Sequence, residues 1–148
     1  MPRSTRTPSG KVTKADAPAS VLDASALLAL LQDENGAAVV VEAIEAGAAI
    51  STVNFSEVLS KLAEHGEFAV PAAMRIHQTM DDALRIEPFT EEDAAEAADL
   101  RPRSKDQGLS LGDRACLALA ARFEVPAVTA DRDWSDLPEI GVRVKLIR

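Results

Sequence analysis

Short apolar segments that alternate with helix-forming segments predict a three-layer α/β fold. The apolar segments are bounded by glycine, proline and polar residues, as buried strands are. Strands that are joined through helices pair in parallel by right-handed crossovers. The 148 residues suffice for one domain with its own hydrophobic core. We therefore expect a parallel sheet between two layers of helices, with functional residues at the carboxyl ends of the strands.

The amino-terminal half of the expected domain begins with a strand that leads at once into a buried helix. This helix is apolar on nearly every side, so the rest of the protein must cover it. Asn35-Gly36 separates it from a second helix, and Gly47 has the position of a carboxyl-terminal capping residue. The expected elements are a strand over 20–23, helices over 24–31 and 37–46, a strand over 48–51 and a helix over 52–64.

The carboxyl-terminal half contains clearer helix starts. Pro71 suits the first position of a helix, and Thr90 is an N-cap followed by acidic residues that the helix dipole favours. The last strand alternates basic with apolar residues, which is typical of an edge strand with one solvated face. The expected elements are helices over 71–82, 90–100 and 110–123, a polar loop over 101–108, and strands over 83–88, 127–129 and 142–147.

Charge is unevenly distributed along the chain. The net charge is −8, but residues 1–20 carry +3, so residues 21–148 carry −11. Residues 1–19 have almost no large apolar side chains, and we expect them to be a disordered basic tail before a domain over 20–148. This tail could touch nucleic acid or be an inert extension. The acidic domain argues against non-specific nucleic-acid binding over its whole surface, but not against a nuclease with local cations.

Several functional classes lack their sequence signals. No apolar run is long enough to span a membrane or to form a secretory signal, so we expect a cytoplasmic protein with no membrane partner. Cys116 is the single cysteine and lies in an apolar helix, which predicts a buried structural thiol, and with only two histidines a zinc site is not expected. Phosphate-binding glycine loops and the nucleophile motif of serine hydrolases are absent.

Five acidic residues carry the functional interpretation, although each also has a local structural explanation. An acid directly before a helix can be its N-cap, and an acid three residues after Asn54 or Ser110 has the spacing of a capping box. The two aspartates in the run from Ala130 can form a turn. The five acids are Asp23, Glu57, Asp113, Asp131 and Asp133.

A parallel sheet would bring these acids to one edge. Each lies at or near a strand end or a helix start, and converging carboxylates repel one another unless a cation neutralises them. Oxygen ligands suit Mg²⁺ or Mn²⁺, which keep several waters and engage phosphate groups. The chemistry indicated is the hydrolysis of a phosphodiester by water that the metal activates. Arg114 and Arg132 flank the acids and could contact phosphate or point into solvent.

Four motifs occur in order along the chain. They are Val21-Leu22-Asp23-Ala24-Ser25-Ala26-Leu27-Leu28, Asn54-x-x-Glu57, Leu111-Gly112-Asp113-Arg114-Ala115 and Val128-Thr129-Ala130-Asp131-Arg132-Asp133-Trp134. Together they resemble the PIN-domain family, and especially the VapC-type toxins of bacterial toxin–antitoxin pairs. The similarity covers roughly residues 20–147. It implies a five-stranded parallel sheet flanked by helices and a Mg²⁺- or Mn²⁺-dependent endoribonuclease.

The resemblance assigns roles to residues by their position in these motifs. Asp23, Glu57 and Asp113 match the three acidic residues of the family's metal site. Asp131 matches the fourth and more variable acid, with Asp133 as the alternative because the Asp-Arg-Asp run can be aligned in two ways. Three polar residues match groups that lie beside the carboxylates; these are Ser25, Asn54 and Thr129.

Partners follow from the same resemblance. The family's usual partner is an antitoxin protein encoded beside the toxin, which can place an arginine in the acidic pocket, and such toxins commonly form homodimers. The basic tail departs from many relatives and has no role in the family. Two alternatives remain: a PIN nuclease that acts in RNA processing or on DNA outside a toxin pair, and a non-catalytic α/β interaction module whose acids only cap helices.

Overall fold

The sheet has five strands, all parallel, in the order β3-β2-β1-β4-β5. The computed structural model describes residues 17–148, so the expected basic tail lies outside the described residues as far as residue 16. The backbone N–H of Ala19 already donates to the Gly47 carbonyl at 2.7 Å. The strands are β1 (Ser20–Leu22), β2 (Ala48–Ser51), β3 (Leu84–Glu87), β4 (Ala127–Thr129) and β5 (Val144–Leu146). The predicted α/β class is confirmed.

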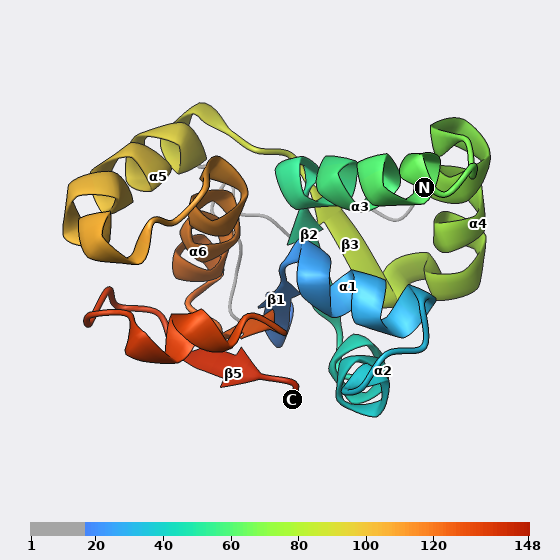
Figure 1. Cartoon of the computed structure of the whole chain (residues 1–148), viewed down its shortest axis with the longest axis horizontal. Helices are drawn as coiled ribbons and strands as arrows, with labels where there is room; N and C mark the ends of the chain where they lie inside the picture. Colours follow the sequence, from blue (N-terminus) through green and yellow to red (C-terminus); the bar gives the residue numbers. More distant parts are fainter. Residues whose placement is uncertain (1–16) are drawn as a thin grey trace.

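Helices cover both faces of the sheet, four on one face and two on the other (Figure 1). The first layer holds α1 (Ala24–Leu31), α2 (Ala37–Glu45), α3 (Thr52–Glu64) and α4 (Ala69–Met80). The second holds α5 (Glu91–Arg103) and α6 (Leu111–Phe123). Short 3-10 helices connect the larger elements at Asp81–Ala83, Lys105–Gln107 and Arg132–Asp136. No helix within residues 17–148 is long and apolar enough to cross a membrane.

The two faces of the sheet build two cores. Successive strand residues point to opposite faces, so Leu22 and its neighbours on β2 and β4 pack under α1, α2 and α3. Val21 and its neighbours pack instead under α6, with Trp134 and Ile140. Because both faces are covered, every residue of the three central strands, β1, β2 and β4, is buried, as expected for a parallel sheet, whereas the edge strands β3 and β5 carry charged residues.

The strand order creates a switch point beside β1. The chain leaves β1 toward β2 and β3, and it later returns to place β4 on the other side of β1. The connections that follow β1 and β4 therefore diverge at the carboxyl edge, which is where ligands bind in open α/β sheets. Asp23 directly follows β1 and Asp131 lies two residues after β4. The fold therefore brings both carboxylates to the point where these connections diverge.

Three element boundaries differ from the expectations. Phe68 is the N-cap residue of α4, so Pro71 is the third residue of that helix and not the first; it is tolerated because N–H groups in the first turn have no helical acceptor. The helix expected to end at residue 100 continues to Arg103, through Pro102, and ends where both the N–H and the hydroxyl of Ser104 donate to the Leu100 carbonyl. A 3-10 turn occupies much of the expected loop.

The last strand is shorter than expected. β5 spans three residues because its partner, β4, has only three residues with which to pair. Gly141 turns the chain just before it with a φ of +79°, a conformation that favours glycine. Beyond β5, the N–H of Ile147 still donates to the Thr129 carbonyl at 3.0 Å. The end of the chain is therefore joined to the carboxyl edge of the sheet.

Candidate metal centre

A pocket of about 230 Å³ opens at the carboxyl edge of the sheet. Its walls come from the start of α1, one side of α3, the start of α6 and the loop after β4. Asp131 lines it and Asp133 does not. The lining residues are Asp23, Ala24, Ser25, Leu28, Asn54, Glu57, Lys61, Asp113 and Asp131. Four carboxylates from four separate segments thus share one opening.

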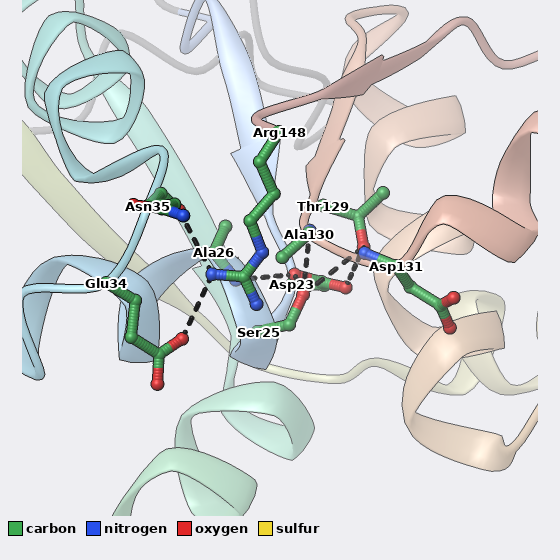
Figure 2. Close-up of polar contacts among 9 residues, drawn as sticks. All are labelled: Asp23, Ser25, Ala26, Glu34, Asn35, Thr129, Ala130, Asp131 and Arg148. Carbon is green, nitrogen blue, oxygen red and sulfur yellow. Dashed lines mark hydrogen bonds and ion pairs between the residues drawn. The ribbon is translucent and has the colours of Figure 1, made fainter.

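Asp23 is the most constrained of these carboxylates. It is the N-cap residue of α1, with Oδ1 accepting from the Ala26 N–H at 2.9 Å and from the Ser25 hydroxyl at 2.7 Å. Oδ2 accepts a hydrogen bond from the Thr129 hydroxyl, which comes from the end of β4 (Figure 2). The expectation that Asp23 caps a helix is confirmed. The same side chain also lines the pocket.

Burial raises the pKa of Asp23 from 3.8 to about 6. The side chain is 5% exposed, and removal from water disfavours its charged form. The hydrogen bonds from Thr129, Ser25 and Ala26 lower the pKa in part, whereas the nearby charge of Asp113 raises it further. The carboxyl group therefore lies in a site where a proton or another cation is favoured.

Glu57 is held against the start of α6. Asn54 donates from Nδ2 both to Glu57 Oε1 at 2.9 Å and to the Gly112 carbonyl at 2.8 Å, which links α3 to α6. A Cβ on residue 112 would lie 2.5 Å from both oxygens of the Glu57 carboxylate. Gly112 thus leaves the space that this carboxylate occupies.

The capping-box explanation of Glu57 is wrong. The N-cap residue of α3 is Ser51, whose hydroxyl accepts from the Val53 N–H, so Asn54 lies inside the helix. The strand passes into α3 without an intervening loop, and the cap therefore falls on the last strand residue. Glu57 is left without a capping role and points its carboxylate toward α6.

Asp113 and Asp131 both make local capping bonds. Ser110 and Asp113 form a complete capping box, in which Asp113 Oδ2 accepts from the Ser110 N–H at 2.9 Å. Asp131 Oδ1 accepts from the Asp133 N–H at 3.0 Å, and the Asp131 N–H donates to the Thr129 hydroxyl. Figure 2 shows the Asp131 carboxylate extending away from Asp23. The turn explanation of these aspartates is confirmed for Asp131.

Cys116 lies in α6 and packs in the core on that face of the sheet. Its thiol is fully buried, and burial raises its pKa well above the usual value, with further increases from the charges of Asp23, Asp113 and Glu57. The expectation of a buried structural thiol is confirmed.

A PIN-domain family model matches residues 20–140, and this range contains all four carboxylates of the pocket. The chain belongs to the PIN-domain family. PIN domains are nucleases, and the family generally uses divalent metal ions. A search of curated proteins found no match.

Solved structures with the same fold include several from bacterial toxin–antitoxin systems. This PIN domain is similar to a chain of a toxin–antitoxin complex from Klebsiella pneumoniae, with a TM-score of 0.63, 20% identity, and coverage of 87% of this chain and 98% of that one. For FitAcB from Neisseria gonorrhoeae the values are 0.65, 20%, 86% and 97%. For VapC20 from Mycobacterium tuberculosis, described as a Sarcin-Ricin loop cleaving toxin, they are 0.65, 19%, 84% and 98%.

The carboxylate oxygens of the PIN pocket are the type of donor that a hard divalent cation prefers. As the side chains lie, however, no three histidine, cysteine or acidic groups within residues 17–148 are placed to hold one ion. The capping bonds of Asp113 and Asp131 explain this, because each directs a carboxylate toward its own backbone. In each case the capping bond engages only one of the two oxygens.

The structure also identifies pocket residues that the sequence did not. Lys61 lines the pocket one helical turn after Glu57, a spacing that would have indicated it. Neither alternative expected for Arg114, a phosphate contact or a solvated side chain, is correct, because the side chain is buried and donates to the Ala97 carbonyl of α5 at 2.9 Å. Arg132 is exposed in the 3-10 helix after β4 and does not line the pocket.

Proposed function

We propose that this PIN domain is a Mg²⁺- or Mn²⁺-dependent endoribonuclease that acts as the toxin of a VapC-type toxin–antitoxin pair. The observation that carries the proposal is the pocket at the switch point, which is lined by Asp23, Glu57, Asp113 and Asp131. The likeness of the fold to toxin–antitoxin structures supports the choice of RNA as the substrate. Acting on cellular RNA requires a cytoplasmic location, which is therefore part of the proposal.

The proposed roles follow from the positions of the four acids in the family's motifs and from the lining of the pocket. Asp23 and Asp113 are the direct ligands, and Glu57 and Asp131 coordinate directly or through water. Asp131 is preferred over Asp133 because only Asp131 lines the pocket. To bind the same ion as Asp23, the Asp113 and Asp131 side chains must turn toward it. Hydrogen bonds from Ser25 and Thr129 fix the position of Asp23 itself. Asn54 fixes Glu57 in the same way.

The proposed reaction is the in-line hydrolysis of an RNA phosphodiester, which leaves 5′-phosphate and 3′-hydroxyl ends. When bound, Mg²⁺ or Mn²⁺ supplies positive charge that activates water and offsets the negative charge developing on the phosphate. The protein contributes carboxylates that would hold the ion, and hydrogen bonds already fix two of them, Asp23 and Glu57. Asp23 must be ionised to take part, and its raised pKa makes this step sensitive to pH.

The proposed partner is a cognate antitoxin that covers the acidic pocket. Structures with this fold include toxin–antitoxin complexes and VapBC complexes bound to DNA. The charge of −11 on residues 21–148 would attract a basic segment, and an arginine could pair with the pocket carboxylates. A homodimer, common among such toxins, is part of the same proposal.

Mapping of cleavage sites in total RNA would test the nuclease proposal. Wild type with Mn²⁺ should produce new 5′-phosphate ends at defined positions, and Asp23→Asn should produce none while keeping its fold. Full activity of Asp23→Asn would overturn the assignment. Induced expression with and without the neighbouring gene tests the toxin role, because growth should stop only when the antitoxin is absent.

A second candidate deserves an experiment because three of the four carboxylates make capping bonds. A non-catalytic interaction module would use these acids for helix caps alone. Calorimetric titration with Mn²⁺ separates the two candidates, since caps alone should bind no ion. A metal centre should bind Mn²⁺ and lose affinity in Asp113→Asn. A PIN nuclease of RNA processing would bind Mn²⁺ equally but would not arrest growth.

A further inference from the structure

One cation lies among the described residues that line the acidic pocket, and this cation is Lys61. It follows Glu57 by four residues in α3, so the two side chains project from the same side of the helix. The backbone of Lys61 is held in the last turn of α3. The ammonium group is carried on a flexible stem at the rim of the carboxylate cluster.

The local contacts of Lys61 do not account for its position. Its ammonium lies 3.5 Å from Glu64 Oε2, and the two side chains are 59% and 65% exposed. An ion pair so open to water contributes little to stability. The hydrogen bonds that hold Asp23 and Glu57 come from other residues. Lys61 is therefore free to leave Glu64 for a better anionic partner.

The chemistry of the pocket indicates which partner this is. An RNA strand has a phosphate on each side of the one that reacts. Without a nearby cation, the carboxylates around the pocket would repel those flanking phosphates. The surrounding domain is acidic as well, with −11 on residues 21–148. A lysine ammonium is a compact point charge that binds phosphate without a fixed orientation.

We propose that Lys61 binds a backbone phosphate next to the scissile bond and positions the RNA strand over the carboxylates. This inference rests on the proposed function, since it deepens the account of the same site. Lys61 acts on binding of the strand and not on the reacting atoms. Its removal should therefore raise KM and leave kcat and Mn²⁺ binding intact.

The test compares Lys61→Met with Lys145→Met, which removes the same charge from the exposed middle of β5, outside the pocket. The substrate is an RNA oligonucleotide that spans a cleavage site mapped with the wild type. Lys61→Met should raise KM about tenfold, the usual weight of one charge-assisted contact, with kcat within about twofold. Lys145→Met should match the wild type.

Three further readouts separate phosphate binding from a merely structural role. The dependence of log(1/KM) on log salt should become shallower by about 0.7 in Lys61→Met, the value for one contact to a single strand. Lys61→Arg should restore KM to within about threefold of wild type, because it keeps the charge. Calorimetric Mn²⁺ affinity should be unchanged or slightly higher in Lys61→Met.

The outcomes distinguish this inference from the proposed function. A wild type that cleaves no RNA overturns both. An active wild type whose KM and salt dependence are unchanged in Lys61→Met overturns the role of Lys61 alone. A fall in Mn²⁺ affinity with no change in KM would assign Lys61 to support of the carboxylates, which also contradicts the inference.

Discussion

At the scale of single residues, the site depends on where each carboxylate is allowed to lie. Asp23 is buried and bonded on both oxygens, whereas Asp113 and Asp131 are bonded on one. In the proposed metal centre Asp23 would be a fixed ligand, and Asp113 and Asp131 would each exchange a capping bond for the metal. The same carboxylate can therefore cap a helix and also bind a metal ion.

The raised pKa of Asp23 predicts how stability changes with pH. A proton binds more tightly to this group in the folded than in the unfolded protein, so its contribution is full below pH 3.8 and is lost as pH rises through about 6. Between pH 4.5 and 7.5 in EDTA, the wild type should lose about 2 kcal/mol more stability than Asp23→Asn. Urea unfolding at both pH values measures the difference.

An exposed acid provides the control for this experiment. Asp136 is exposed at the end of the 3-10 helix after β4. Asp136→Asn should follow the pH dependence of the wild type, because the steep loss belongs to Asp23. If Asp23→Asn loses as much stability as the wild type over this range, the raised pKa is wrong.

Gly112→Ala should disable the proposed metal site without unfolding the protein. The new methyl group would lie 2.5 Å from the Glu57 carboxylate oxygens, and that carboxylate is the flexible end of its side chain, so it can move away. Alanine is favoured over glycine in a helix by roughly 1 kcal/mol, which offsets local strain. We expect an unchanged melting temperature and at least about a tenfold loss of Mn²⁺ affinity by calorimetry.

A double mutant shows whether this effect acts through Glu57. If Gly112→Ala acts by displacing that carboxylate, it should have little further effect on Mn²⁺ affinity in a Glu57→Gln background. An equal loss in both backgrounds would mean that residue 112 disturbs another ligand. Wild-type affinity in Gly112→Ala itself would remove Glu57 from the site.

At the scale of elements, the sequence predicted most of the fold because the relevant interactions are local. Thr90 and Ser110 are the observed caps of α5 and α6, both with complete capping boxes. Two of the errors concern residues whose side chains make long-range contacts. Asn54 looked like a cap by spacing, but its side chain bridges α3 to Gly112, 58 residues away. Arg114 likewise looked solvated, and only the packing of α5 against α6 explains its burial.

A buried ion pair joins α6 to α5. Arg122 contacts both oxygens of Asp93, at 3.1 and 3.2 Å, and Asp93 is 2% exposed. Arg122→Met would leave a buried carboxylate without its partner, and we expect a loss of about 3 kcal/mol in the free energy of unfolding by urea titration. Arg101→Met, which changes an exposed residue of α5, should cost less than about 0.5 kcal/mol.

A double mutant can separate the stability lost through an unpaired carboxylate from the stability lost through poorer packing at this contact. In Asp93→Asn/Arg122→Met the unpaired charge is absent, so the double mutant should be more stable than Arg122→Met alone. A double mutant less stable than either single mutant would show that packing, and not the uncompensated carboxylate, dominates the loss.

At the scale of the whole molecule, the candidate site joins segments that are far apart in sequence. The pocket is lined by residues that follow β1 and β4 and by residues of α3 and α6. The order of the strands therefore brings four acids that are remote in sequence into one pocket. The sequence could predict that these acids share an edge, because parallel strands end together. It could not predict the rotamers, since these depend on hydrogen bonds such as that between Thr129 and Asp23.

Metal binding should therefore stabilise the entire fold. An ion held by Asp23, Asp113 and the α3 carboxylate would tie both sides of the sheet together, and binding to the folded state alone adds about 2.7 kcal/mol at a concentration 100 times Kd. For a domain of this size that corresponds to a rise of roughly 5–10 °C in Tm. Thermal unfolding with Mn²⁺ and with EDTA measures this rise in Tm.

The rise in Tm should be lost in Asp113→Asn, reduced in Asp131→Asn and kept in Asp133→Asn, because Asp133 does not line the pocket. The reverse order for the last two variants would make Asp133 the fourth ligand.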